Sequence, residues 1–117
     1  MQQSQFGIGI DLVKIKRFEK IPYKTRPKFY KKIFTPTEIK YCLRYRHPAK
    51  HFAVRFALKE AVKKSIKKNV NFIDIVTGFR SKPVVSIRDD QEHIFLASLS
   101  HEDEYAIAVV ISIRQIR

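Results

Sequence analysis

Cysteine, glycine and acidic residues are all scarce in this sequence. The single cysteine, Cys42, excludes a disulfide within the chain and fits a reducing compartment. No window is long and apolar enough to span a membrane, and the first residues lack the basic segment and unbroken apolar run of a signal peptide. We therefore expect a cytoplasmic protein. Hydrophobic residues still make up 44% of the 117 residues, which is enough for a globular core.

The scarcity of acids is confined to the first half of the chain. Residues 1–68 hold 19 Lys and Arg against four Asp and Glu, a balance of +15, whereas residues 69–117 carry −2. Such a surface attracts a polyanion, which can be nucleic acid, an anionic membrane, a phosphorylated ligand or an acidic protein. Charge alone does not choose among these four, although nucleic acid is a common partner of small basic domains.

The order of apolar patterns and turn residues predicts one α+β domain over residues 1–117. Thr35-Pro36-Thr37-Glu38 is typical of a helix start, with a capping box between Thr35 and Glu38. We expect short helical pieces within 17–34, a helix over 35–46 and a long central helix over 49–67. Alternation predicts strands over 6–15, 72–77, 83–87, 94–98 and 105–113. This order favours an antiparallel sheet with a helical layer.

The first predicted strand places Gly7, Gly9 and Asp11 on one face. Glycine weakens a strand, and there it often marks the close approach of a ligand or of another backbone. Asp11 therefore lies on a face that has been cleared of bulky side chains.

The central helix carries an acid where an amphipathic pattern would not place one. Arg55, Lys59 and Lys63 form a basic stripe, and Glu60 falls outside both that stripe and the apolar sector. Glu60 has two interpretations at this point. It can form an ordinary i,i+4 ion pair with Lys64, or it can belong to a metal or proton-transfer site.

Asp11 and Glu60 are the two acids of the basic half without a structural explanation. Two carboxylates from different elements suit Mg²⁺, which completes its shell with water and phosphate oxygens. The alternative, about equally weighted, is that each acid pairs with a nearby Lys or Arg. His101, at the end of a predicted strand, is either a phosphate contact, proton shuttle or metal ligand, or simply an exposed histidine. The other histidines lack ligand-like spacing, so we do not expect a zinc site.

Four motifs in order carry a family resemblance. They are Gly7-Ile8-Gly9-Ile10-Asp11-Leu12-Val13; Phe34-Thr35 with Glu38 and Tyr41-Cys42; Arg55-Phe56-Ala57-Leu58-Lys59-Glu60-Ala61 with Lys64; and Ser98-Leu99-Ser100-His101-Glu102 with Tyr105-Ala106. This set resembles the holo-(acyl-carrier-protein) synthases, which are small homotrimeric 4′-phosphopantetheinyl transferases of fatty acid biosynthesis. The likeness spans nearly the whole chain.

The resemblance implies a reaction and a set of residues. It implies Mg²⁺-dependent transfer of 4′-phosphopantetheine from coenzyme A to a serine of an apo-acyl carrier protein, which releases 3′,5′-ADP. Asp11 and Glu60 would hold the metal, Glu60 would take the serine proton directly or through water, and Lys64 would contact phosphate. The remaining coenzyme A residues would be Lys82, Pro83, Ser100 and His101, and an acidic carrier would meet Arg17, Lys20, Lys24 and Arg26. Sites of this family lie between adjacent subunits.

The chain departs from the family pattern at three places. Lys14 replaces the usual acid, residues 66–71 replace a glycine-rich turn, and Ser81-Lys82-Pro83 replaces Gly-Lys-Pro. These changes bear on how the nucleotide end of coenzyme A is held. Two other hypotheses follow from the same residues: a basic nucleic-acid-binding module, and a family member that has kept the fold but lost activity.

Overall fold

The computed structural model describes residues 3–116, and the side chains of residues 5–115. The chain begins with strand β1 (Gln3–Lys14), continues through helices α1 (Lys16–Lys20), α2 (Pro27–Ile33), α3 (Pro36–Leu43) and α4 (Pro48–Ser65), and then forms a short 3₁₀ helix, η1 (Phe72–Asp74). Strands β2 (Ile75–Arg80), β3 (Lys82–Ile87), β4 (His93–His101) and β5 (Tyr105–Ile116) complete it. The predicted α+β class is confirmed.

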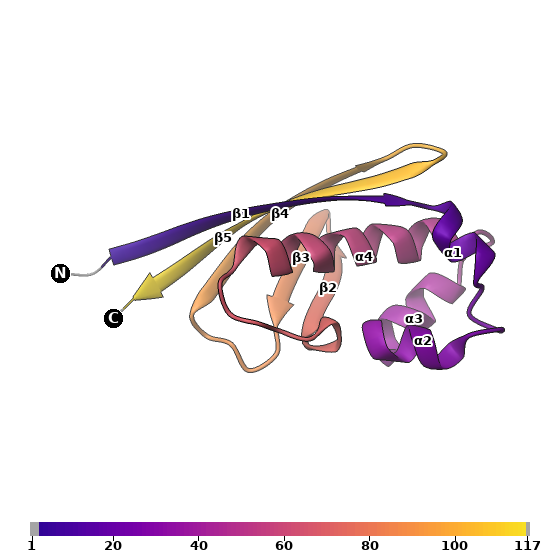
Figure 1. Cartoon of the computed structure of the whole chain (residues 1–117), viewed down its shortest axis with the longest axis horizontal. Helices are drawn as coiled ribbons and strands as arrows, with labels where there is room; N and C mark the ends of the chain where they lie inside the picture. Colours follow the sequence, from indigo (N-terminus) through magenta and orange to yellow (C-terminus); the bar gives the residue numbers. More distant parts are fainter. Residues whose placement is uncertain (1–2, 117) are drawn as a thin grey trace.

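The strands form two antiparallel sheets. One has the order β1-β5-β4, and the other pairs β2 with β3. Helix α4 lies along one face of the three-stranded sheet, the three short helices gather at one end of the molecule, and both termini lie at the other end (Figure 1). The core lies between α4, the sheets and an aromatic cluster that contains Phe18, Tyr30, Phe34 and Phe52. None of the helices within residues 3–116 is long and apolar enough to cross a membrane.

Most predicted elements are present with shifted ends. The capping box at the start of α3 is confirmed, because Thr35 Oγ1 accepts from the Glu38 N–H and Glu38 returns a bond to the Thr35 N–H. The strand prediction over 72–77 was wrong for its first half, where residues 72–74 form a 3₁₀ turn whose Asn71 carbonyl accepts from the Asp74 N–H. Cys42 is a buried free thiol in α3, and burial raises its pKa to about 11.

The second face of the three-stranded sheet is apolar and uncovered. Alternation along the strands turns Gly7, Gly9 and Asp11 towards α4 and leaves the intervening side chains outside. Phe6 is 73% exposed and Leu12 is 59% exposed. We call this surface the apolar sheet face; its exposed large side chains are Phe6, Ile8, Ile10, Leu12, Ile94, Leu96 and Ile111.

Candidate active site

Strand β1 and helix α4 touch backbone to backbone. A β-carbon placed on Gly7 would lie 1.8 Å from the Ser65 carbonyl oxygen, and one on Gly9 would lie 1.9 Å from that of Ala61. The glycines therefore mark the close approach of another backbone, which was one of the two explanations that the sequence offered. Two strand residues and four helix residues both advance about 6 Å, so this register continues to place Asp11 beside Ala57.

Lys64 reaches from α4 to Asp11 on β1. Its Nζ lies 3.1 Å from Asp11 Oδ1 and also donates to the Ile10 carbonyl. The Asp11 side chain is 12% exposed, and that of Lys64 is 54% exposed. The intrahelical Glu60–Lys64 pair does not form, because Lys64 bonds to the strand instead.

Glu60 lies on the same flank of α4 as Lys64, one turn earlier. Its side chain is half-buried, and within residues 5–115 it has neither an ion-pair nor a hydrogen-bond partner among the side chains and backbone described. A carboxylate in this state can accept a cation or a proton.

The donor set at this junction fits Mg²⁺. Asp11 and Glu60 supply carboxylate oxygens, which are the protein ligands that Mg²⁺ prefers, and two are enough when phosphate and water complete the shell. No cluster of three or more His, Cys, Asp or Glu residues occurs in the part of the chain that the structure describes.

Two residues of the basic stripe of α4, Arg55 and Lys59, are buried, and the third, Lys63, is half-buried. Lys59 is fully buried, and its Nζ lies 2.7 Å from Glu38 Oε1 and donates to the Ile33 and Phe72 carbonyls. Glu38 also accepts from the N–H and hydroxyl of Thr77. Burial acts to raise the pKa of Glu38. The Lys59 charge and the hydrogen bonds from Lys59, Thr77 and Thr35 together outweigh burial, so the pKa of Glu38 lies below its ordinary value. The sequence showed the cap at Glu38 but not this second role.

Arg55 is buried on the other flank of α4. It donates to Thr77 Oγ1 at 2.8 Å, and its guanidinium lies over the rings of Tyr41 and Phe79 at 4.4 and 5.0 Å. A cavity of about 190 Å³ adjoins it. Histidines on both sides, His51 of α4 and His101 of β4, also line that cavity. Burial, together with the nearby Lys50, Arg55 and His101, lowers the pKa of His51.

The predicted coenzyme A residues are divided between the two flanks of α4. Asp11, Glu60 and Lys64 lie together on the flank that faces β1. His101 ends β4, on the opposite edge of the sheet, and lines the Arg55 cavity. The exposed Ser100 precedes it, and Lys82 and Pro83 begin β3 beside β4. A single chain does not bring these two groups together.

The predicted carrier-binding residues do gather at one place. Arg17 and Lys20 belong to α1, and Lys24 and Arg26 to the turn that follows; all four are exposed. The Arg17 guanidinium lies 5.2 Å from the ring centroid of Phe56. Phe56 is one helical turn before Glu60, so the basic surface borders the flank of α4 that carries the carboxylate cluster.

The family that the chain matches defines it as a small α+β transferase. Residues 7–110 match the family model of the 4′-phosphopantetheinyl transferase superfamily. The chain therefore belongs to that superfamily, and the resemblance seen in its motifs is confirmed.

Particular relatives are similar over almost their full length. The holo-(acyl-carrier-protein) synthase of Thermodesulfovibrio yellowstonii is 39% identical over 109 residues, which cover 90% of this chain and 96% of that protein. The crystal structure of the Helicobacter pylori synthase in complex with coenzyme A has a TM-score of 0.75 at 32% identity and covers 90% and 98% of the two chains. The Bacillus anthracis synthase in complex with coenzyme A (3′,5′-ADP) has a TM-score of 0.72 at 32% identity, with 92% and 96% covered.

Proposed function

We propose that this protein transfers 4′-phosphopantetheine from coenzyme A to a serine of an apo-acyl carrier protein, giving the holo-carrier and 3′,5′-ADP. The observation that carries the proposal is the Asp11–Glu60–Lys64 cluster at the β1–α4 junction of a chain in this family. Asp11 pairs with Lys64 on a partly exposed surface, and Glu60 lies one helical turn before Lys64 on the same flank. Charged groups placed in this way suit the binding of a pyrophosphate.

Each residue of the cluster has a role in the transfer. Asp11 and Glu60 would hold Mg²⁺, which when bound neutralises charge on the pyrophosphate. Lys64 is ion-paired with Asp11 in this structure, and its side chain is exposed enough to turn its ammonium group towards a phosphate oxygen. The serine oxygen forms a bond to phosphorus while the bond from phosphorus to the 3′,5′-ADP oxygen breaks. The serine proton passes to Glu60, directly or through a water molecule.

The proposal includes assembly of the protein as a homotrimer, with each active site lying between two subunits. The apolar sheet face supports assembly, because exposed apolar surface of this extent on a small domain is usually buried against a partner. The division of the predicted site residues between the two flanks of α4 supports active sites that are shared between subunits. Asp11 and Glu60 of one subunit would be completed by His101, Ser100, Lys82 and Pro83 of a neighbour.

An acidic acyl carrier protein is the partner that the charge distribution fits. Its approach is favoured by the +15 balance of residues 1–68, and the exposed Arg17 lies beside the carboxylate flank. This assignment leaves no need for nucleic acid as the ligand. The setting in this proposal is fatty acid biosynthesis in the cytoplasm, and the lone buried Cys42 is consistent with that compartment.

A mass measurement tests the activity directly. Apo-acyl carrier protein from the source organism, incubated with the protein, coenzyme A and Mg²⁺, should gain the mass of one phosphopantetheine group, and 3′,5′-ADP should appear in equal amount. No gain with this or any other apo-carrier would overturn the proposal. A gel-shift titration with duplex DNA and RNA tests the nucleic-acid alternative, which requires tight binding with a steep salt dependence.

A further inference from the structure

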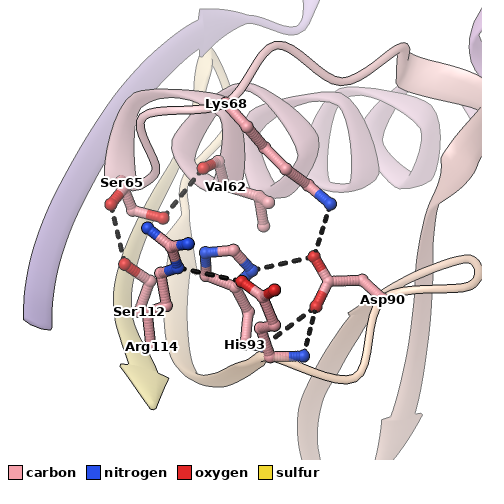
Figure 2. Close-up of polar contacts among 8 residues, drawn as sticks. Val62, Ser65, Lys68, Asp90, His93, Ser112 and Arg114 are labelled. Carbon is pink, nitrogen blue, oxygen red and sulfur yellow. Dashed lines mark hydrogen bonds and ion pairs between the residues drawn. The ribbon is translucent and has the colours of Figure 1, made fainter. Parts of the chain in front are cut away.

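The end of helix α4 is closed by side chains instead of by glycine. Helices commonly end on a glycine in the left-handed conformation, but the chain has glycine only at positions 7, 9 and 78, and Ile66 leaves α4 in an extended conformation. Ser65 Oγ donates to the Val62 carbonyl, and Ser112 Oγ of β5 donates to the Ser65 carbonyl. Figure 2 shows these bonds at the end of the helix. The following segment therefore depends on contacts from elsewhere in the fold.

Lys63 of α4 holds the far end of this segment, because its Nζ donates to the Val70 carbonyl at 2.8 Å. Asp90, in the turn between β3 and β4, supplies a contact from elsewhere in the fold. Its Oδ2 lies 2.7 Å from Lys68 Nζ and accepts from His93 Nδ1 at 2.8 Å, while its Oδ1 accepts from the backbone N–H groups of Glu92 and His93. Figure 2 shows these contacts around Asp90, whose side chain is only 2% exposed. Burial raises its pKa, but the bonds from Lys68, His93 and Glu92 lower it by more, so the pKa lies well below its usual range.

The segment that Lys68 anchors forms one wall of a cavity. Residues 66–68 line a space of about 700 Å³ together with Lys64, Gly7 and Arg114. Lys64 belongs to the proposed active site, so this cavity adjoins the place where the pyrophosphate would lie. Four of its lining side chains are cationic, Lys64, Lys67, Lys68 and Arg114, against one anionic side chain, Glu92, which is paired with Arg114. A ligand with several phosphates suits such a lining.

We propose that Asp90 is a positioning residue for coenzyme A: by holding Lys68 it fixes residues 66–68 as one wall of the cavity that receives the 3′,5′-ADP portion. This inference rests on the proposed function. It explains how the chain dispenses with a glycine-rich turn after α4: an ion pair from the β3–β4 turn fixes the segment from outside. Asp90 itself touches no part of the ligand.

Calorimetry and steady-state kinetics on the full-length protein test the inference. Asp90→Asn and Lys68→Met should each weaken 3′,5′-ADP binding and raise KM for coenzyme A roughly tenfold, with kcat nearly unchanged. The double variant should be no worse than Lys68→Met alone, because Asp90 acts through Lys68. Lys68→Arg keeps the pair and should bind like the wild type.

Lys67→Met is the matched control. Lys67 is a cation of the same segment, but it forms no ion pair with Asp90 among the described residues. Its effect should therefore add to that of Asp90→Asn. Additive effects of Asp90→Asn and Lys68→Met would overturn the inference, because they would show that Asp90 does not act through Lys68.

Unfolding measurements separate a structural role from a positioning role. If Asp90→Asn lowers the free energy of unfolding but leaves both 3′,5′-ADP affinity and KM unchanged, Asp90 only stabilises the fold and the inference is wrong. If Asp90→Asn does not fold, the exposed Lys68→Met carries the same test. A wild-type protein that binds neither coenzyme A nor 3′,5′-ADP would overturn the proposed function itself, and this result differs from any of the variant outcomes.

Discussion

A β-carbon on Gly9 would lie 1.9 Å from the carbonyl oxygen of Ala61. Strand β1 can therefore lie against helix α4 only because position 9 has no side chain. This close approach brings Asp11 within reach of Lys64 and onto the helix flank that carries Glu60. The geometry of the proposed active site thus depends on the absence of a β-carbon at Gly9, two residues before Asp11.

Gly9→Ala should destabilise the protein and disturb the site. The added methyl group forces β1 and α4 apart, and overpacking of this kind costs about 1–3 kcal/mol of unfolding free energy. Urea unfolding measures the loss. Gly78→Ala is the control, because no atom lies within 4 Å of a β-carbon there and the backbone φ of Gly78 is not positive. Equal effects of the two substitutions would contradict the assigned role of Gly9.

Asp11→Asn and Glu60→Gln should each reduce carrier modification by orders of magnitude while leaving the fold intact. The partly exposed Asp11–Lys64 pair contributes at most about 1 kcal/mol to stability, so loss of activity would not reflect unfolding. Chelation should abolish activity, and added Mg²⁺ should restore it. Glu19→Gln, at an exposed acid of α1, is the control. Near-normal turnover in both site variants would show that the metal assignment is wrong.

Two inactive variants should complement each other if subunits share sites. Mixed trimers of Asp11→Asn and His101→Ala chains, formed by co-expression, contain some sites that take Asp11 from one chain and His101 from the other. Random assembly gives about one quarter of the wild-type activity, as for any heterologous ring interface. A mixture of Asp11→Asn and Glu60→Gln should stay inactive, because both residues belong to the same half. Absence of recovery in the first mixture would contradict site sharing.

Lys59→Met should cost about 3–5 kcal/mol, because it leaves the Glu38 carboxylate buried without its cation. The double variant Glu38→Gln/Lys59→Met removes both charges and should regain much of this loss. Urea unfolding at neutral pH distinguishes the two. A double variant as unstable as the single one would show that the packing of the lysine chain, not its charge, is what matters.

The same pair should contribute to acid sensitivity. The pKa of folded Glu38 lies below its ordinary value of 4.5, so its stabilising contribution is complete above that pH and is lost as the pH falls through the lowered pKa. Unfolding free energies measured from pH 7 to pH 3 should therefore fall more steeply for the wild type than for the double variant. Identical slopes would contradict the lowered pKa.

Arg17→Glu should raise KM for the carrier about tenfold while leaving KM for coenzyme A unchanged, because it reverses a charge on the surface that meets an acidic partner. The difference from wild type should shrink as salt is added. Arg88→Glu makes the same charge change at an exposed position in the β3–β4 turn and should have little effect. Equal effects of the two variants would mean that only net charge matters.

The local features of the fold were predictable because nearby residues control them. The capping box at Thr35 and the short helices within 17–34 follow from side chains a few positions apart. Element ends were less predictable, as the 3₁₀ turn at residues 72–74 shows, because apolar residues alone do not distinguish a strand from a tight turn.

The polar interior could not be predicted, because its partners are far apart in the chain. The sequence showed Lys59 as one residue of a basic stripe, and only tertiary packing places its ammonium beside the Glu38 carboxylate, 21 positions earlier in the chain. Lys68 and Asp90, 22 positions apart, meet only because the β3–β4 turn lies against the segment after α4. A side chain's charge shows that it needs a partner or water, but not which of them it finds.

Residue type and local spacing were enough to predict the α+β order and to single out Asp11 and Glu60, and the resemblance of four motifs indicated the family and added Lys64 to the candidate site. Tertiary structure alone decided that Lys64 bonds to Asp11 instead of Glu60, and that His101 lies across α4 from them. The physical reason is that a helix presents its residues in different directions around its axis, and only packing against the sheet fixes which flank each direction faces.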